Sequence, residues 1–391
     1  MDKLLLPFRQ SKLLNTLFIS NVFISLHYAM IIYVNSSYLS NFFSETQVSA
    51  LYIIGSIINT ILLLNASRIL EKVGIYKFTM ATVILELLAT LGMALSSTPF
   101  FVGLYFLIHL NIIALLLFNM DIYVENISKN NALTGSVRAT YLTMTNVTII
   151  VAPSIVALLL LGNKYLYVYA ISCLCIIPAY YYTKKFKAVV TRKVHHINIK
   201  NTIAEYVKNR DLYNIFTAGF LLQLFYAYMV VYTPIYLNKY IGFSWPEIGV
   251  MFTIMLVPFV LFEMPVGELE DYKYGEKEFL TIGFVIMGLA TIFMSFITLK
   301  VFWIWAVVLF ITRIGASLVE VSTESYFWKL VHPDKTDVIG FFRINRPISF
   351  MVAPLLATLT FQFIPFQYIF IVVGSIMILG TKYSLSLNDT K

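Results

Sequence analysis

Charged side chains interrupt stretches of this sequence that are otherwise almost wholly apolar. Asp121, Arg313 and Glu320 each lie several residues inside such a stretch. If the stretches cross a bilayer, an ionised group at their centre costs ~2.5–3.5 kcal/mol on insertion scales, so each residue needs a partner or a function. We predict that the three form a charged site for a solute or a proton. A buried ion pair that only holds helices together is the alternative.

The spacing of these residues supports a shared site. Asp121 with Glu125, and Glu320 with Glu324, are four residues apart, which places each pair on one face of a helix. Arg313 precedes Glu320 by seven residues, about 20° away around the helix and ~10 Å along its axis. Two acids near one arginine favour binding of a proton or a cationic group.

Uncharged and titratable groups at similar depth are further candidates. We assign His27, Asn35 and Gln223 to the same substrate or proton site, although a lone histidine is more often a hydrogen-bonded core residue than a ligand. Glu86 and His109 are also in the middle of apolar stretches. For these two we expect a structural role, with Glu86 neutral and hydrogen-bonded to a neighbouring helix.

Composition shows which elements must position these residues. Hydrophobic residues make up 59% of the 391 residues and charged residues only 12%, whereas soluble domains contain about 25% charged residues. A membrane-spanning helix needs ~20 mainly apolar residues. We therefore predict an all-α integral membrane protein with twelve transmembrane helices, at residues 14–39, 46–67, 76–97, 100–125, 137–161, 165–183, 212–237, 246–266, 278–298, 301–327, 338–360 and 366–385.

The charges of the loops predict the orientation. Loops on one side carry most of the lysines and arginines, whereas the other side has only Lys164, Lys239 and Lys300. The positive-inside rule then places both termini in the cytoplasm of a multi-pass protein of the cell membrane. The net charge of +8 is explained by these loops and predicts no nucleic-acid partner. Cys173 and Cys175 point to different sides of one helix, so we expect buried thiols, no metal site and no cofactor.

The two halves of the sequence resemble each other at an offset near 200 residues. Ser44 to Val48 matches Ser244 to Ile248, Asp121 to Glu125 matches Glu320 to Glu324, and Ala152-Pro153 matches Ala353-Pro354. We predict a six-helix bundle at 1–183, a cytoplasmic linker at 184–211 and a second six-helix bundle at 212–391. Within the linker, apolar residues from Ile199 to Val207 indicate a short surface helix, with a flexible segment as the alternative.

Two loops carry a related pattern of acids, bases and glycines. The loop between spans two and three reads Glu71-Lys72-Val73-Gly74-Ile75-Tyr76-Lys77, and residues 265–277 repeat the pattern with Gly267, Asp271 and Gly275. In these loops the chain resembles the major facilitator superfamily. It departs from the family pattern at Ser67, where a glycine is usual, and at Glu71, where aspartate is usual.

The resemblance implies two six-helix bundles with a central cavity lined by helices one, four, seven and ten. It also implies that the patterned loops contribute to a cytoplasmic gate, in which ion pairs latch the two halves together. The residues that we assign to this gate are Glu71, Gly74, Asp271, Gly275, Glu125, Glu324, Arg138, Arg343 and Arg346.

The predicted function is secondary active transport of a small solute by alternating access, with a proton as a possible second partner. An uncoupled facilitator and a drug exporter are alternatives within transport, and a receptor or scaffold without transport is the alternative outside it. The residues around Pro153 lack the glycines of proton-driven drug antiporters, which disfavours an exporter.

The chain has no phosphate-binding loop of the Gly-x-x-x-x-Gly-Lys-Ser/Thr type and no hydrolase or metalloprotease motif, so we predict that it is not an enzyme. We expect a monomer in the lipid bilayer.

Overall fold

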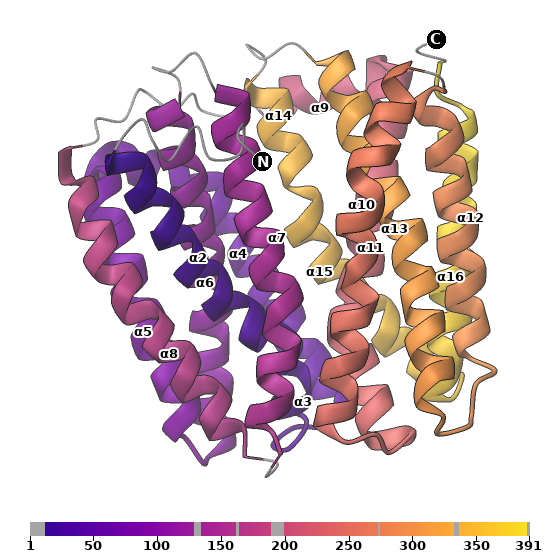
Figure 1. Cartoon of the computed structure of the whole chain (residues 1–391), viewed down its shortest axis with the longest axis horizontal. Coiled ribbons are helices and arrows are strands. Elements are labelled where there is room, and N and C mark those ends of the chain that lie inside the picture. Colours follow the sequence, from indigo (N-terminus) through magenta and orange to yellow (C-terminus); the bar gives the residue numbers. More distant parts are fainter. Residues whose placement is uncertain are drawn as a thin grey trace. The chain divides into compact units, whose positions relative to one another are not determined.

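The computed structural model describes residues 12–128, 134–161, 164–188, 199–272, 274–331 and 336–388, and every regular element in these ranges is a helix (Figure 1). Contacts between Cα atoms divide the chain into two units. The first contains Met1–Ser44 and Ile54–Val194, and the second contains Glu45–Ile53 and His195–Lys391.

The described residues of the first part of the chain form seven α-helices and a short 3-10 helix. They are α2 (Lys12–Ile32), α3 (Asn35–Leu39), α4 (Glu45–Val73), α5 (Ile75–Leu95), α6 (Pro99–Ser128), α7 (Thr134–Leu159), α8 (Tyr165–Thr183) and η1 (Lys184–Ala188). Helix α2 packs on α7 and α8, and α5 packs on α6 and α8. Large side chains such as Phe18, Leu116 and Phe186 fill the core between them.

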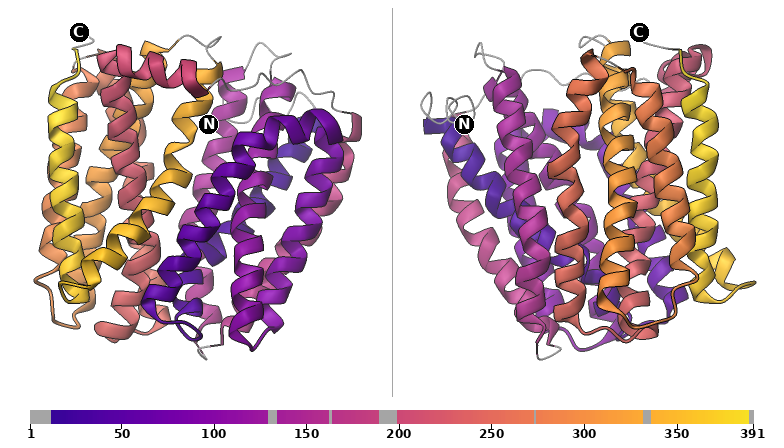
Figure 2. Two further views of the ribbon diagram at one scale, coloured as in Figure 1. Left: turned by 180° about the vertical axis from the view of Figure 1, so that it is seen from behind. Right: turned by 45° about the vertical axis from the view of Figure 1, so that its right-hand side comes forward.

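The second part contains α9 (Ile199–Lys208), α10 (Arg210–Ile235), η2 (Tyr236–Tyr240), α11 (Trp245–Tyr272), α12 (Glu276–Met294), α13 (Phe302–Leu330), α14 (Thr336–Arg343), α15 (Asn345–Phe361), η3 (Phe366–Tyr368) and α16 (Ile369–Leu385). Helix α12 lies against both α13 and α16 (Figure 2). Helix α10 packs on α13, α15 and α16.

Eleven helices in the described part of the chain are long and apolar enough to cross a membrane. Helix α7 contains a shorter apolar segment, Met144–Leu159. With α7 added to the eleven, the predicted set of twelve is recovered, and the predicted all-helical membrane fold is confirmed. The eleventh predicted span begins as two helices, α14 and α15, which meet at Ile344.

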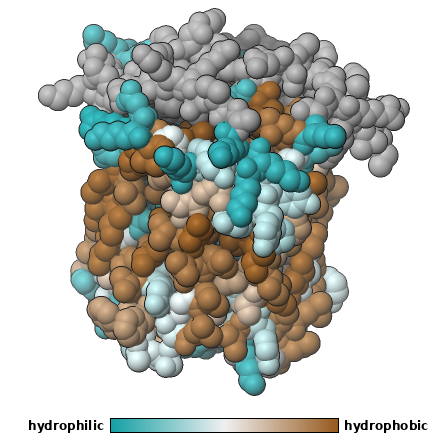
Figure 3. Space-filling model, turned by 90° about the vertical axis from the view of Figure 1, so that its left-hand side faces the viewer, coloured by the Kyte–Doolittle hydropathy of each residue, from teal (hydrophilic) through white to brown (hydrophobic). Residues whose placement is uncertain are grey.

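Many large apolar side chains are exposed, unlike those of a soluble protein. Large apolar residues such as Leu95, Leu158 and Leu161 are about 70% exposed. The face seen in Figure 3 is hydrophobic over most of its height, with hydrophilic residues gathered towards one end. Polar residues such as Asn21 and Thr90 are fully buried. An apolar exterior around a partly polar interior is what a lipid solvent requires.

Glycines allow α12 and α13 to approach closely. A Cβ atom added at Gly315 would lie 2.5 Å from the backbone nitrogen of Met287 and 2.6 Å from the backbone oxygen of Gly283. Backbone atoms cannot move aside as a flexible side chain can, so only glycine fits at this contact. The contact fixes the position of α13, which carries Arg313 and Glu320.

The segment that follows the first unit forms helix α9. The sequence alone was compatible with either a short helix or a flexible segment here. Tyr206 is buried, and its hydroxyl donates to the backbone oxygen of Val338 at 2.9 Å. Its ring packs against those of Phe216 and Phe341, with centroid distances of 5.1 and 5.0 Å. These contacts attach α9 to α10 and α14, both of the second unit.

Candidate functional site

In the second unit, α10 and α13 bring a carboxyl group and a phenol together. The Tyr226 hydroxyl donates to Oε2 of Glu320 at 2.6 Å, and both side chains are partly buried. Gln223, nearly one turn before Tyr226 on α10, is also partly buried. A carboxyl group that has a hydroxyl partner and remains accessible can bind a polar solute or a proton.

Arg313 lies deeper in the same unit. Its side chain is 1% exposed, and the centre of its guanidinium group lies 5.0 Å from the ring centroid of Phe225 and 5.7 Å from that of Tyr226. These distances are in the range of cation–π attraction. Tyr226 therefore connects the two charged residues, because its hydroxyl binds Glu320 and its ring lies near Arg313.

Asp121 lies on α6 of the first unit, and its side chain is exposed. Because Asp121 and Glu320 belong to different units, their approach to one another stays a prediction.

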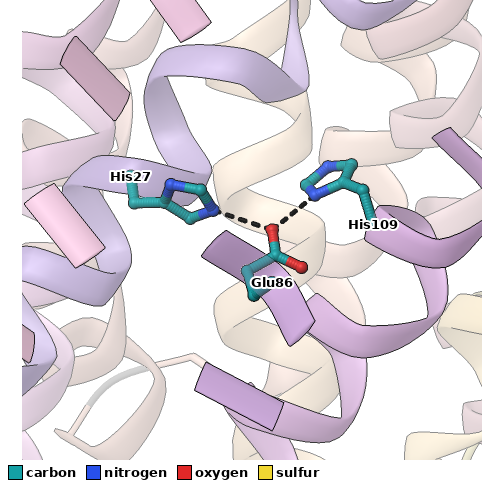
Figure 4. Close-up of side chains that lie close together, drawn as sticks. All are labelled: His27, Glu86 and His109. Atoms are coloured by element: carbon teal, nitrogen blue, oxygen red, sulfur yellow. Dashed lines mark hydrogen bonds and ion pairs between the residues drawn. The ribbon is translucent and has the colours of Figure 1, made fainter. Parts of the chain in front are cut away.

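The first unit contains a second group of ionisable residues, His27 on α2, Glu86 on α5 and His109 on α6 (Figure 4). Both histidines point at the same carboxylate oxygen. Nε2 of His27 lies 2.8 Å from Oε1 of Glu86, and Nδ1 of His109 lies 2.5 Å from it. The side chains of His27 and Glu86 are 0% exposed and that of His109 is 2% exposed. We call these three residues the His–Glu–His cluster.

Polar neighbours hold both imidazole rings in place. Nδ1 of His27 lies 3.1 Å from the backbone oxygen and 2.7 Å from the hydroxyl of Ser172 on α8. Asn35 lies 3.3 Å from Nε2 of His109, and its Oδ1 accepts from the Tyr169 hydroxyl at 2.7 Å. Thr90 donates to Oε1 of Glu86 at 3.3 Å. The cluster thus joins α2, α5, α6 and α8 through a continuous network.

From the sequence alone, His27 and Asn35 were predicted at the substrate or proton site, whereas Glu86 and His109 were expected to be separate structural residues. The structure brings all four together inside the first unit. The available signal was that three ionisable residues occupy the middle of apolar spans and each needs a partner. The rotation of each helix about its axis, which decides the partners, is not readable from spacing within one helix.

Gly74, at the predicted gate, links α4 and α5 with a φ of +81°, a backbone conformation that favours glycine. Glu71, just before it, is exposed at the end of α4. Gly275, in the second copy of the motif, differs because its φ is −83°, a conformation that any residue adopts.

Arg343 forms two hydrogen bonds with the Glu324 carboxylate, at 2.5 and 3.0 Å, and both side chains are more than one third exposed. Both residues belong to the second unit, and Arg346 is exposed nearby on α15. The predicted ion pairs of Glu71 and Asp271 with the opposite half stay predictions. The side chains of Glu125, Arg138 and Asp271 lie outside the part of the chain that the structure describes.

Two buried acids of the second unit, Glu270 and Glu276, were not predicted as site residues from the sequence. Glu270 accepts a hydrogen bond from Ser322, and Glu276 forms an ion pair with Lys329. Both carboxyl groups are 0% exposed. Burial raises the pKa of Glu270 to about 7, the Ser322 hydrogen bond opposes that rise, and the negative charge of Glu276 adds to it. Glu270 can therefore change protonation near neutral pH.

Comparison with known proteins identifies the family and the fold. The sequence profile of the Major Facilitator Superfamily matches residues 17–255 and 215–386. No curated protein matches the sequence. In three dimensions the chain is similar to the crystal structure of the nucleoside transporter NupG, with a TM-score of 0.72 and 12% identity over 96% of this chain and 98% of that chain. It is also similar to a bacterial homologue of the human lysosomal transporter Spinster in an inward-facing, unoccupied conformation, with a TM-score of 0.70 and 11% identity over 96% of this chain and 94% of that chain. Likeness at such low identity shows the fold alone.

Proposed function

Because the chain belongs to the Major Facilitator Superfamily, we propose that it is a secondary active transporter that moves a small solute across the cytoplasmic membrane by alternating access. In this proposal the transport is coupled to protons, both termini are cytoplasmic, and the monomer is the working unit. The observation that carries the proposal is the group formed by Glu320, Tyr226 and Arg313 inside the spans of the second unit.

Each residue of this group has a distinct role. Glu320 takes up and releases the proton, since a partly buried carboxyl group is more costly to ionise than one in water. Arg313 counters the negative charge when the proton leaves and can attract an anionic group of the solute. Tyr226 orients the carboxyl group, and Gln223 adds a neutral hydrogen-bonding group. Asp121 supplies a second acid from the first unit.

Two steps identify a solute and test the coupling. The purified full-length protein is first screened by thermal shift against nucleosides, sugars, amino acids and cationic drugs. Nucleosides are included because NupG, which has the same fold, is a nucleoside transporter. A stabilising compound is then supplied in radiolabelled form to proteoliposomes with and without an imposed pH gradient.

The expected result is uptake that increases with the gradient in the wild type and loses this dependence in Glu320→Gln, while exchange of the solute persists. Glu278→Gln is the matched control, because Glu278 is an exposed glutamate of the same unit. If a compound binds but is not transported, the protein is a receptor or scaffold and the proposal is wrong. Flux indifferent to the gradient would identify an uncoupled facilitator.

A further inference from the structure

The hydrogen bonds around the His–Glu–His cluster define where its protons lie. The backbone oxygen of Ser172 can only accept, so the tautomer of His27 with a hydrogen on Nδ1 is the one that makes the 3.1 Å contact a hydrogen bond. The Ser172 hydroxyl donates to the backbone oxygen of His27 at 3.2 Å, which leaves its lone pairs to accept from the same Nδ1. His27 therefore has its first N–H on the side that faces away from Glu86.

The proton of His109 is assigned in the same way. Tyr169 donates to Oδ1 of Asn35, so the Asn35 amide nitrogen faces Nε2 of His109 and donates to it. Nε2 of His109 is then an acceptor, and its Nδ1 carries the hydrogen that is donated to Oε1 of Glu86 at 2.5 Å. Each imidazole now has the single N–H of its neutral form.

One contact is left without a hydrogen. Nε2 of His27 and Oε1 of Glu86 are 2.8 Å apart, and with both imidazoles neutral and Glu86 ionised, two lone pairs would face each other across this distance. A further proton resolves the conflict, either on Nε2 as an imidazolium or on Oε1 as a carboxylic acid. In both cases the net charge of the cluster is zero, as suits three side chains that are at most 2% exposed.

We propose that His27, Glu86 and His109 form a proton-binding site in the first unit, which holds one dissociable proton between Nε2 of His27 and Oε1 of Glu86. The site is separate from the Glu320 group of the proposed function and does not depend on it. When the proton leaves, a buried negative charge remains and the attraction between α2 and α5 at this point becomes a repulsion. Oε2 of Glu86 has no hydrogen-bond partner among the described residues, so the released charge is poorly stabilised.

A divalent metal ion is the competing ligand, because the three ligand atoms lie within 4.8 Å of one another. Two ligands of a tetrahedral zinc ion are ~3.3 Å apart, since each bond is about 2.0–2.1 Å. The observed separations of 2.8 and 2.5 Å are shorter, so both contacts would have to lengthen. A divalent ion on one carboxylate would also leave a buried net charge of +1. Spacing and charge therefore both favour the proton.

The surroundings of the site are polar and include other titratable groups. On α8, Cys173 directly follows Ser172, which contacts His27, and Tyr169 reaches the site through Asn35. Helix α7 also packs on α2, where its Thr145 hydroxyl and the backbone oxygen of Tyr141 accept from Asn21. None of these neighbouring groups is a histidine or a carboxylic acid. A measurement of the charge state of His27 or Glu86 therefore reports the proton between these two residues.

The experiment is a ¹⁵N NMR titration of the full-length protein, labelled at histidine and embedded in lipid nanodiscs, from mildly acidic to alkaline pH. His27→Gln and His109→Gln assign the two resonances. We expect His109 to remain neutral with its hydrogen on Nδ1, and His27 to respond to the loss of a single proton. Glu86→Gln, which has no dissociable proton, should remove that response, and Glu320→Gln should leave it unchanged.

Two results would overturn the proposal. One is that both histidines of the wild type titrate independently near the free value of ~6.5. The other is that the wild type, incubated with zinc and dialysed, retains one equivalent of metal that the Glu86→Gln protein lacks, which would make the cluster a metal site. The first result does not involve Glu86→Gln, so the proposal stays testable if that variant does not fold.

Discussion

Nδ1 of His109 lies 2.5 Å from Oε1 of Glu86, an oxygen that is also 2.8 Å from Nε2 of His27. One carboxylate oxygen therefore connects α2, α5 and α6 in the interior of the first unit. Removing either histidine leaves a buried acceptor with fewer donors, and this has consequences for stability as well as for proton binding.

Replacement of His109 by leucine should lower the free energy of unfolding by about 1–3 kcal/mol, the usual cost of leaving a buried polar group without its partner. His109→Gln should cost less, because an amide can still donate to Glu86. The measurement is reversible unfolding in mixed micelles at one pH. Equal losses in the two variants would show that ring packing, and not the hydrogen bond to Glu86, stabilises this position.

Glu270 should make the stability of the protein depend on pH near neutrality. Its pKa is raised from 4.5 to about 7, so between these values the folded state holds a proton that the unfolded state has lost. The stability contributed by this proton is fully present below pH 4.5 and is lost as the pH rises through about 7. Glu270→Gln should match the wild type at low pH and be more stable above pH 7.

Thermal unfolding of both proteins across this pH range tests the prediction. The difference between the two curves cancels the contribution of groups that both proteins share, including the His–Glu–His cluster. Parallel curves would show that Glu270 does not bind the proton.

Alanine at Gly315 should destabilise the second unit. The new Cβ would lie 2.5 Å from the backbone nitrogen of Met287, so α12 and α13 would have to separate, at a typical cost of 1–3 kcal/mol for overpacking. Gly267→Ala is the control, since its nearest neighbour would be a side-chain carbon of Val321 at 3.8 Å. That variant should unfold at or above the wild-type temperature, because alanine favours helix over glycine by about 1 kcal/mol. A tolerated Gly315→Ala would contradict the close contact.

Tyr226→Phe separates two functions of one side chain. The variant keeps the ring near Arg313 and removes the hydroxyl that donates to Glu320 at 2.6 Å. If the hydroxyl orients the carboxyl group for proton exchange, uptake driven by a pH gradient should fall at least tenfold, while binding of the solute in the thermal-shift assay should change little. Uptake unchanged in Tyr226→Phe would assign the hydroxyl a structural role only.

The two ends of α8 should be accessible from opposite sides of the membrane. Lys164 precedes this 19-residue helix and Lys187 follows it, and both are exposed. The helix is ~28 Å long, close to the ~30 Å of a hydrocarbon core. In a protein with the buried Cys173 and Cys175 replaced by alanine, Lys164→Cys should react with an impermeant maleimide added outside intact cells, and Lys187→Cys only after permeabilisation. The reverse pattern would invert the predicted orientation.

The sequence by itself determined that the protein lies in a lipid bilayer and that its fold is all-helical. Long apolar stretches can satisfy their backbone groups within a bilayer only as helices, so the spans, the repeat and the resemblance to the family were readable from one chain. Arg313 and Glu320 were identified because charge inside an apolar stretch is costly wherever the helix points.

Only the tertiary structure decided which of these groups meet. The convergence of His27, Glu86 and His109 depends on the rotation and depth of three helices packed together, and residues 59 and 23 positions apart along the chain leave no periodic signal of it. The same is true of Tyr226, one tyrosine among 26, whose hydroxyl reaches Glu320 only because α10 packs on α13. Spacing fixes neighbours within a helix, whereas contacts between helices follow from how all the surfaces of a bundle pack at once.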